Sequence, residues 1–554
     1  MFYRCRFPVI ASIVWLLMNF LMTSLESRML NAQDTEVDLL IVGGTSGGIT
    51  AAIAGKEAGL RVLLIEPSAH LGGLSSAGLG ATDIGNKVAI GGLSREFYKR
   101  IKLFYDRPES WTFEKKTDYR SPRQKPGEDT LWTFEPRVAE AVFREWLDEK
   151  KVPYRLRCPI DRSPSSVVRE GKRLKSLRTA AGEVLSARYF IDATYEGDLL
   201  PLASVDFIIG REANAAYNET LNGVQTRQAT KHQFFPGVDP YVRRGDKSSG
   251  LLPGVQPEGP GDEGSGDHRL QAYCLRMYLT DVEPNRIPFA EPQGYDERDY
   301  ELLLRNFEAG LNNLPWHSIM MPNRKTDTNN NTGFSTDFIG ANTDWPEASY
   351  AEREAIYRRH VHYQAGLCWT LAHHPRVPEK IRREAQQWGL AADEFRDSQN
   401  WPHALYVREG RRLVGRTVMT EHHCRGKQTA AHSVGMAAYT MDSHNVQRYV
   451  DANGQVRNEG DVQVAGFPPY PIDIGALIPK EEQCENLAVP VCLSASHIAY
   501  GSIRMEPVFM VLGQSAALMA AEADKDNRSL QSIDYTELRT KLLAADQVLS
   551  LPVQ

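Results

Sequence analysis

The 554-residue sequence contains few cysteines, and they are not clustered. The seven cysteines are dispersed with no C-x-x-C pair, at Cys5, Cys158, Cys274, Cys368, Cys424, Cys484 and Cys492. An iron–sulfur cluster or a structural zinc site normally requires closely spaced thiolates, so we expect neither. No other metal site is predicted. The spacing leaves the pairing of any disulfides open.

The sequence also lacks an excess of positive charge. Its 64 lysines and arginines face 70 aspartates and glutamates, for a net charge of -6. Proteins that bind nucleic acid in general are usually basic, and no helix-turn-helix or zinc-finger motif occurs, so no nucleic-acid partner is expected. No internal repeat is present. The length is sufficient for two or more domains.

A long apolar run occurs at the N-terminus, where Phe7–Met22 follows Arg4 and Arg6. A basic start, an apolar stretch and small residues ending near Ala32 predict a secretory signal over residues 1–33, and hence a periplasmic or secreted protein. The apolar run is short for a membrane span, which needs about 20 residues. We therefore expect no stable membrane span after signal removal; an uncleaved anchor is the alternative.

The stretch VDLLIVGGTSGGITAAIAGKEAGLRVLLIEP predicts a strand–helix–strand unit. Its apolar segments Val37–Val42 and Leu60–Ile65 favour strands, and the alanine-rich Gly47–Ala58 favours a helix. No second glycine-rich unit of this kind follows, because Gly245–Gly266 lacks both flanking elements. A dedicated NAD(P)H domain is therefore not expected.

The turn of this unit departs from the usual dinucleotide-binding motif. A strict G-x-G-x-x-G frame that starts at Gly43 places Thr45 where the middle glycine belongs. Thr45 is small and keeps its N–H free, so the turn and the start of the helix remain suited to a pyrophosphate. Glu66 ends the second strand at the position of an acid that binds ribose hydroxyls, which disfavours a 2′-phosphate and hence NADP.

Three further segments suit an FAD site assembled from distant parts of the chain. Gly72-Gly73 lies just after Glu66, and Ala193-Thr194 with Gly197-Asp198 closes a strand far downstream. Near the C-terminus, the predicted strand Leu487–Leu493 leads to the predicted helix Met505–Ala523, whose positive N-terminal end is expected to face a reduced flavin. A plain NAD dehydrogenase has no need of all three segments.

Several motifs together resemble one family. They look like the FAD-dependent oxidoreductase family that is often found in secreted bacterial proteins, some members of which are labelled "xanthan lyase-related". The motifs are GGTSGG, EPSAHLGGLSSAGLGATDIG, IDATYEGDLL, REGRRLVGRTVMTEHHC, TMDSHNVQRY and VPVCLSASHIAYGSIRMEPVFMVLGQSAA. The sequence is more distantly similar to heterodisulfide-reductase flavin subunits and fumarate-reductase-type flavoproteins. The flavin motifs give no support to a lyase activity.

The resemblance implies an α/β fold with FAD as the cofactor. It implies a Rossmann-like, glutathione-reductase-like FAD-binding domain with an inserted α+β substrate or cap domain. The predicted FAD-binding residues are Gly43, Gly44, Thr45, Ser46, Gly47, Gly48, Glu66, Gly72, Gly73, Leu74, Ala193, Thr194, Gly197, Asp198, Met505 and Glu506. The predicted divisions are the FAD-binding parts 37–107, 131–210 and 408–522, the cap 211–407 and the C-terminal tail helix 523–554.

Similarity to fumarate-reductase-like proteins also suggests catalytic residues in SASHIAYGSIRMEP. It implies that His497 accepts a proton, that Arg504 clamps substrate or flavin, and that Tyr500 contributes to the same site. The structural alternative is that His497 only satisfies a carbonyl group and that Arg504 pairs with Glu506.

Two other polar segments are weaker candidates for a ligand site. Asp442 and His444 lie in AHSVGMAAYTMDSHNVQRY, which favours a polar loop slightly over a catalytic role. MPNRKTDTNNNTGFSTDF, which contains Lys325 and Asp327, suits a hydroxylated ligand such as a sugar, but a solvated loop is favoured for most of it.

The function expected from the sequence is hydride transfer to FAD from an alcohol, or less readily an amine, on a polar small molecule. The substrate class includes carbohydrate derivatives, and oxygen or another acceptor would reoxidise the flavin. One alternative is a double-bond reductase of the fumarate-reductase kind, with Arg504 as proton donor. The other is a non-catalytic envelope protein that retains the fold to bind a glycan or a partner.

Overall fold

The computed structural model describes residues 35–551, so the predicted secretory signal lies outside the described residues. Among the described helices, none combines the length and the apolar character needed to cross a bilayer. The six cysteines in this part of the chain are all free, so no disulfide links the described residues.

The first sheet is built around a buried central strand, β1. Its order is β3-β2-β1-β6-β5-β4, and β20 also pairs with β6. The strands are β1 (Thr35–Val42), β2 (Val62–Ile65), β3 (Tyr154–Arg155), β4 (Val167–Glu170), β5 (Arg173–Arg178), β6 (Val184–Asp192) and β20 (Leu487–Ala488). Strands β3, β2, β1, β6 and β20 are parallel, and β5 and β4 extend the sheet as an antiparallel meander. This arrangement confirms the Rossmann-like α/β prediction.

The predicted strand over Leu487–Leu493 is wrong for most of its length. Only Leu487 and Ala488 pair with β6. Pro490 has no backbone N–H to contribute to a ladder, which explains why the pairing ends there.

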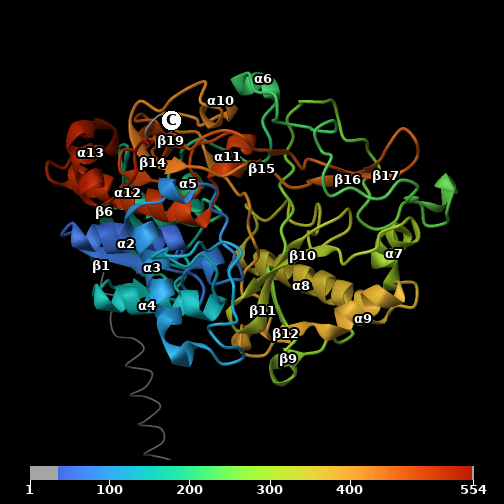
Figure 1. The fold of residues 1–554 in the computed structure, drawn as a ribbon. Helices are drawn as coiled ribbons and strands as arrows, with labels where there is room; N and C mark the ends of the chain where they lie inside the picture. Colours follow the sequence, from blue (N-terminus) through green and yellow to red (C-terminus); the bar gives the residue numbers. More distant parts are fainter. Residues whose placement is uncertain (1–34, 552–554) are drawn as a thin grey trace, which may run out of the picture.

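Two helices from opposite ends of the chain pack together on this sheet (Figure 1). They are α2 (Ser46–Glu57) and α12 (Glu506–Asp524), both almost entirely buried. Glycines bring their backbones close together, because a side chain at Gly513 would overlap the carbonyl oxygen of Gly47. Pro507 lies in the first turn of α12, where its missing N–H has no cost.

The other helices outside the middle segment come before residue 203 and after residue 420. They are α3 (Gly92–Asp106), α4 (Pro136–Glu149), α5 (Leu199–Leu202), α10 (Glu421–Cys424), α11 (His497–Ile503) and α13 (Tyr535–Ala544). Helix α4 is amphipathic and buries one face, which includes Val138, Val142, Phe143, Trp146 and Leu147. Helix α13 lies within the predicted tail helix, 523–554, and covers 10 of its residues.

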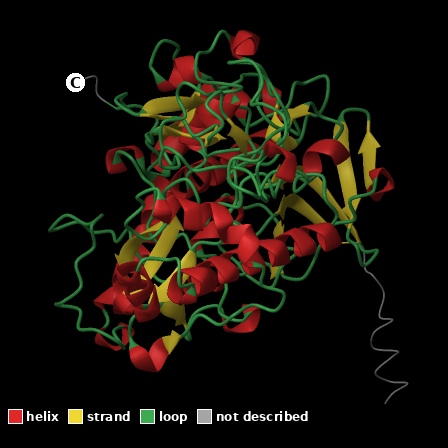
Figure 2. Cartoon of the chain, turned by 90° about the vertical axis from the view of Figure 1, so that its right-hand side faces the viewer, coloured by secondary structure: helices red, strands yellow, loops and turns green. Residues whose placement is uncertain are grey.

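A second sheet, formed only by the middle of the chain, lies apart from the first (Figures 1 and 2). Its order is β10-β11-β8-β12-β9, and all neighbours are antiparallel. The strands are β8 (Met277–Thr280), β9 (Arg286–Ile287), β10 (Trp316–Met321), β11 (Lys325–Asn330) and β12 (Gly389–Ala391). The helices of the middle segment are α6 (Asn214–Tyr217), α7 (Glu301–Glu308), α8 (Tyr350–His373) and α9 (Glu379–Gln387). Helix α6 lies away from this sheet, near α10 (Figure 1).

The solvated loop favoured for the asparagine-rich segment is wrong for its central part. Residues Lys325–Asn330 form β11, and the side chains of Lys325 and Asp327 are buried. Each is neutralised inside the protein: Asp327 accepts two bonds from Arg276 at 2.7 and 2.8 Å, and Lys325 contacts acids described below. Buried charges persist when they are paired in this way.

Short two-stranded sheets complete the fold. They pair β7 (Phe207–Ile208) with β13 (Arg412–Leu413), β14 (Ser433–Ala437) with β19 (Tyr470–Asp473), β15 (Met441–Asp442) with β18 (Gln463–Val464), and β16 (Gln447–Val450) with β17 (Val456–Glu459). The β16–β17 hairpin falls in the predicted third FAD-binding part, but Val456 packs in the core of the middle segment.

Candidate cofactor and substrate site

The glycine turn between β1 and α2 is held in place by Thr45. Its hydroxyl donates to the carbonyl oxygen of Ala193 at 2.8 Å and accepts from the N–H of Gly48 at 3.2 Å. Thr45 is therefore the N-cap of α2 and connects this turn to the end of β6. The N–H groups that precede Gly48 have no partner within the helix, as is general for a helix start, and suit a phosphate.

Gly43 has a requirement that no other residue type meets. Its φ is +106°, and an added Cβ would lie 2.7 Å from the carbonyl carbon of Ala193 and 2.8 Å from the nitrogen of Thr194. The turn after β1 can approach the residues after β6 this closely only if position 43 has no side chain.

Glu66 directly follows β2 at the same edge of the sheet. Its carboxylate accepts from the N–H of Gly44 at 2.7 Å and from the N–H of Ser68 at 2.8 Å. The acid predicted to bind ribose is thus also tied to the glycine turn.

The segment after β6 forms a second turn beside the first. Asp192 accepts from Thr194 and from the N–H of Leu199, and the Thr194 hydroxyl accepts from the N–H groups of Gly197 and Asp198. Burial raises the pKa of Asp192 to about 7, although these bonds oppose the shift. This turn places Thr194 and Asp198 near Gly43.

Asp198 is paired with arginines from several segments. Arg353 on α8 contacts both carboxylate oxygens at 2.8 Å, Arg162 lies at 3.3 Å and Arg411 at 3.4 Å. Burial opposes ionisation, but Arg353 and its neighbours hold the pKa of Asp198 below its usual value. A charged Asp198 therefore attaches the middle segment to the glycine turns.

Tyr195 joins the Gly72–Leu74 segment to the start of α12. Its hydroxyl accepts from the N–H of Leu74 at 2.9 Å and donates to Glu506 at 2.7 Å. Ser75 also contacts Glu506, at 3.3 Å. Burial raises the pKa of Glu506 to about 7. Glu506 does not pair with Arg504, contrary to the structural alternative raised from the sequence.

These turns open on one cavity, here called the cofactor cavity, of about 300 Å³. The predicted residues that line it are Gly43, Gly44, Thr45, Glu66, Gly73, Thr194 and Asp198. The predicted residues outside the lining are Ser46, Gly47, Gly48, Gly72, Leu74, Ala193, Gly197, Met505 and Glu506, and they lie in the turns and helix starts behind it. The middle segment closes the cavity with Trp345, Tyr350, Tyr357 and His403.

The cavity fits a dinucleotide on independent structural grounds. Gly43 leaves a space that a side chain would fill, and the buried hydroxyl of Ser46, at the start of α2, has no hydrogen-bond partner among the described residues. The Rossmann-like sheet, the capped helix start and the acid after β2 define a dinucleotide-binding α/β protein. A family model described as FAD dependent oxidoreductase matches residues 38–542, and the chain belongs to this family. It is an oxidoreductase, and FAD is its cofactor.

Solved structures that resemble the chain have low overall similarity to it and include flavin monooxygenases. A flavin-containing monooxygenase from Stenotrophomonas maltophilia is 15% identical, covers 28% of this chain and 38% of its own, and has a TM-score of 0.18. The anhydrotetracycline hydroxylase OxyS from Streptomyces rimosus is 15% identical, covers 32% of this chain and 36% of its own, and has a TM-score of 0.21. THI4 from Thermovibrio ammonificans is 16% identical, covers 36% of this chain and 72% of its own, and has a TM-score of 0.22. No curated protein matches the chain.

We expect Glu66→Gln to weaken FAD binding about 10- to 100-fold, because a charged hydrogen-bond acceptor contributes about 1.5–3 kcal/mol. Glutamine keeps the size and one acceptor oxygen, so the turn should persist. Titration of the apoprotein with FAD, followed by flavin fluorescence, measures the effect. Glu57→Gln, at the exposed end of α2, is the control. An unchanged affinity in the Glu66 variant would show that ribose does not bind there.

A second cavity, here called the polar cavity, has a volume of about 400 Å³. It lies between the middle segment and residues 406–463, and its lining includes Asp442, His444 and Asn329. Both arginines of its lining are paired with acids, Arg276 with Asp327 and Arg123 with Asp83 at 3.2 Å. The further lining residues are two histidines, one isoleucine, and several amides and hydroxyls, namely His232, His317, Ile319, Asn330, Asn331, Tyr406, Tyr439, Thr440 and Gln463.

Tyr195 and Tyr406 connect the two cavities. Tyr195 lines the cofactor cavity and Tyr406 lines the polar cavity. Tyr406 belongs to a small apolar cluster with the predicted cofactor residue Leu74, and Tyr195 packs against this cluster. The polar cavity is therefore adjacent to the part of the site predicted for the flavin.

The predicted catalytic residues lie behind these cavities. His497 is buried on α11, and its Nδ1 lies 2.8 Å from Glu409. The hydroxyl of Tyr500 donates to the carbonyl oxygen of Val491 at 3.1 Å. Neither side chain belongs to the lining of the cofactor or polar cavity. Their catalytic roles stay predictions.

Arg504 comes closer to the polar cavity than the other two. It donates to the hydroxyl of Tyr406 at 3.3 Å and to the carbonyl oxygen of Asp442 at 3.0 Å, both of which line that cavity. Its Nε has no partner among the described residues. Arg504 thus supports the wall of the cavity from behind.

His444 has the geometry of a proton acceptor. Its Nδ1 lies 2.9 Å from Asp337, and its Nε2 lies 3.9 Å from Asp442 within the polar cavity. An acid on one ring nitrogen orients the ring and leaves the other nitrogen free to accept a proton. Burial and the nearby Arg408 lower the pKa of His444, which keeps the ring neutral at pH 7.

Sequence reasoning missed several residues of the site. Tyr195 lies in the motif IDATYEGDLL, of which only an alanine, a threonine, a glycine and an aspartate were predicted to bind FAD. Tyr406, Trp345 and Arg353 lie in the predicted cap, where no motif surrounds them. The aromatic and arginine content of the middle segment was the only available signal.

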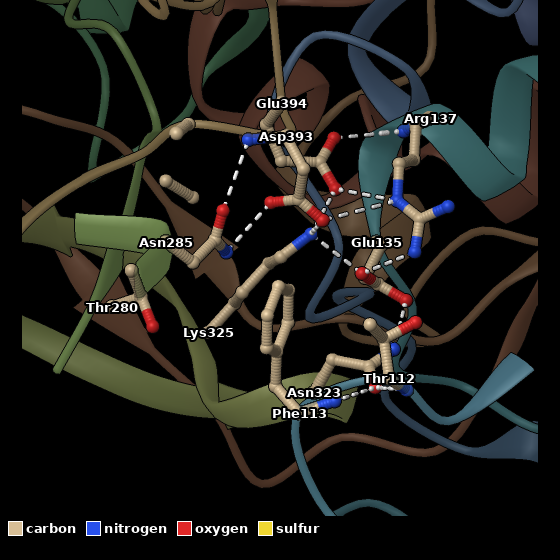
Figure 3. Close-up of polar contacts among 12 residues, drawn as sticks. Thr112, Phe113, Glu135, Arg137, Thr280, Asn285, Asn323, Lys325, Asp393 and Glu394 are labelled. Atoms are coloured by element: carbon tan, nitrogen blue, oxygen red, sulfur yellow. Dashed lines mark hydrogen bonds and ion pairs between the residues drawn. The ribbon is translucent and has the colours of Figure 1, made fainter. Parts of the chain in front are cut away.

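A buried lysine occupies the position that a metal ion would need (Figure 3). Within the described residues, Glu135, Asp393 and Glu394 have oxygens within 4.8 Å of one another. Lys325 Nζ lies 2.6 Å from Glu135, 2.6 Å from Asp393 and 2.7 Å from Glu394. Arg137 adds a second positive charge, 2.9 Å from Glu135. This Lys325 cluster joins the start of α4 to the second sheet.

Proposed function

We propose that the protein oxidises an alcohol group on a polyhydroxylated small molecule, including carbohydrate derivatives, held in the polar cavity. The observation that carries this proposal is the lining of that cavity: paired arginines among histidines, amides and hydroxyls, next to the FAD site. Such groups offer both donors and acceptors, and both arginines are already paired with acids, so hydroxyl groups suit this lining. Amine oxidation is the less favoured variant, and oxygen or another small acceptor would complete the cycle.

Bound FAD supplies a hydride acceptor in this reaction. The chain supplies orientation and a proton acceptor. We assign His444 Nε2 to accept the hydroxyl proton of the substrate, with Asp337 holding the ring. Arg504 positions Tyr406 and Asp442 at the cavity wall.

The test is anaerobic flavin bleaching with a panel of sugars, sugar alcohols and amines. We expect a polyol to reduce the wild-type flavin, and His444→Gln to reduce it at least about 100-fold more slowly, since general bases contribute about 10²–10⁴-fold. Both forms should retain FAD and bind the polyol by calorimetry. The control is His432→Gln, at an exposed position. A His444 variant that bleaches at the wild-type rate would remove His444 from the mechanism.

The same assay predicts a pH dependence. The base must be neutral to accept a proton, and the pKa of His444 is lowered. The rate of bleaching should therefore remain flat as the pH falls from 7 to the ordinary histidine pKa of about 6.5, and decline only below it. Reoxidation of the reduced protein by an unsaturated acid, with no bleaching by any polyol, would instead favour the double-bond reductase.

We also propose that the protein is exported, on the basis of its N-terminal segment. The narrower resemblance to members labelled xanthan lyase-related stays a prediction. N-terminal sequencing of the mature protein tests the export, and a mature protein that begins at Met1 would contradict signal cleavage.

A further inference from the structure

A third cavity lies wholly in the middle segment and the β16–β17 hairpin. It has a volume of about 310 Å³ and shares no lining residue with the cofactor or polar cavity. Aromatic rings dominate its walls, from Tyr300, Phe334, Phe338 and Tyr363. Phe338 and Tyr363 are stacked with their ring centres 4.1 Å apart. We call it the aromatic pocket; its size is that of a small-molecule site.

One charged side chain of this pocket, Arg448, is buried without an acid. Only 4% of Arg448 is exposed. Its Nε donates to the amide oxygen of Asn458 at 3.0 Å and its Nη2 to the carbonyl oxygen of Gly333 at 3.3 Å, and both acceptors are neutral. Across the described residues it takes part in no ion pair. Burial lowers the pKa of Arg448 to about 10, which reflects the cost of its uncompensated charge.

Other buried arginines of this protein are paired with carboxylates. Arg211, Arg276 and Arg353 each contact a carboxylate at 2.8 Å or less. Arg408 and Arg412 are likewise paired with Asp337 and Glu212. Arg448 instead lies between Phe234 and Phe334, 5.2 and 5.3 Å from their ring centres. Stacking on rings attracts a guanidinium but does not neutralise it.

The free edge of Arg448 faces the pocket. A side chain at Gly254, which lines the pocket, would begin 3.1 Å from Arg448 Nη1. Arg359 and His362 also line the pocket, against a single acid, Asp299. Burial raises the pKa of Asp299, which weakens its competition for the cations. The pocket therefore combines flat apolar walls with an excess of positive charge.

We propose that the aromatic pocket binds a small aromatic monocarboxylate, with its ring among Tyr300, Phe338 and Tyr363 and its carboxylate on Arg448. A guanidinium and a carboxylate form charge-assisted hydrogen bonds of matching geometry. Such a ligand supplies the one group that the buried guanidinium lacks. This site is separate from the proposed substrate site and does not depend on the proposed oxidation.

The experiment is calorimetric titration of the FAD-loaded protein with benzoate and with benzamide, its neutral isostere. We expect benzoate to bind at least about tenfold more tightly than benzamide, because hydrogen bonds to charged groups are about twice as strong as neutral ones. Arg448→Gln keeps two donors and removes the charge, and should abolish this preference. Arg358→Gln, on the exposed face of α8 and outside the lining of the pocket, should change benzoate affinity by less than about threefold.

Three outcomes would overturn the proposal: no benzoate binding at millimolar concentration, equal affinity for benzamide, or wild-type benzoate affinity in Arg448→Gln. A thermal melt verifies that each variant is folded. If Arg448→Gln does not fold, Phe338→Leu replaces it. This variant should weaken both ligands while the preference for benzoate remains, and unaltered affinities there would equally contradict the site.

Discussion

Gly43→Ala is expected to lower FAD affinity by at least about 100-fold. The substitution adds a Cβ 2.7–2.8 Å from the backbone of Ala193 and Thr194, at a residue whose φ is +106°. The left-handed conformation alone costs about 1–2 kcal/mol, but the clash is with backbone and can relax only if β1 and β6 separate at the glycine turn. That separation moves the pyrophosphate-binding N–H groups. FAD titration of the apoprotein gives the affinity.

Gly59→Ala is a matched control for this variant. Gly59 also has a positive φ, +91°, but no atom lies within 4 Å of its added Cβ. It should lose a similar increment of thermal stability from backbone strain and retain its FAD affinity. The comparison separates conformational strain from steric conflict. If Gly43→Ala binds FAD as tightly as Gly59→Ala, the close approach of β1 and β6 is not required for the cofactor.

Lys325→Met is expected to destabilise the protein by about 3–5 kcal/mol, the usual cost of removing one partner from a buried ion pair. The variant leaves Glu135, Asp393 and Glu394 facing one another with only Arg137 to balance them. In the wild-type protein, Lys325 keeps its charge despite burial because these three acids raise its pKa. Denaturant unfolding of the FAD-loaded protein measures the loss.

The loss should depend on pH in a defined direction. Burial already raises the pKa of Glu394 to about 7 in the intact protein, and removing Lys325 raises the folded-state pKa values of these acids further. Groups with a raised folded-state pKa stabilise the fold at low pH, and this stability declines as the pH increases through those values. The difference between wild type and variant should therefore grow from pH 5 to pH 8.

Two further variants test the origin of the effect. Lys325→Met combined with Glu394→Gln should recover part of the stability, because one of the repelling carboxylates is gone. Lys102→Met removes a lysine that pairs with Asp106 near the surface and should cost less than about 1 kcal/mol. A cost for Lys325→Met that is small and constant with pH would contradict a charge-balancing role.

Part of the cofactor site follows from local sequence. A strand, a tight turn and a helix start are consecutive, so the spacing of Gly43, Thr45 and Glu66 already indicated a dinucleotide site. The same holds for the turn after Asp192, whose glycine and threonine are close neighbours in the chain. These features depend on short-range geometry, which local sequence encodes.

The substrate side of the molecule could not be predicted in this way. His497 was preferred to His444 because its segment resembles fumarate-reductase-like proteins. Only the fold shows that Asp337, 107 residues away, lies beside the His444 ring. Lys325 was placed in a solvated loop because its three acid partners are 68 to 190 residues distant. A charged residue is normally exposed, and burial becomes favourable only when partners are present.

The amino-acid sequence by itself therefore determined the class of protein: the glycine turn, the acid after β2 and the separated motifs sufficed for an α/β protein that binds FAD. The tertiary structure alone decided which polar residues share a cavity, which charges are paired, and that Arg448 is not. The physical reason is the separation along the chain between the residues that determine each property. Backbone conformation at a turn depends on adjacent residues, whereas the charge state and role of a buried side chain depend on partners that only folding brings within a few ångströms.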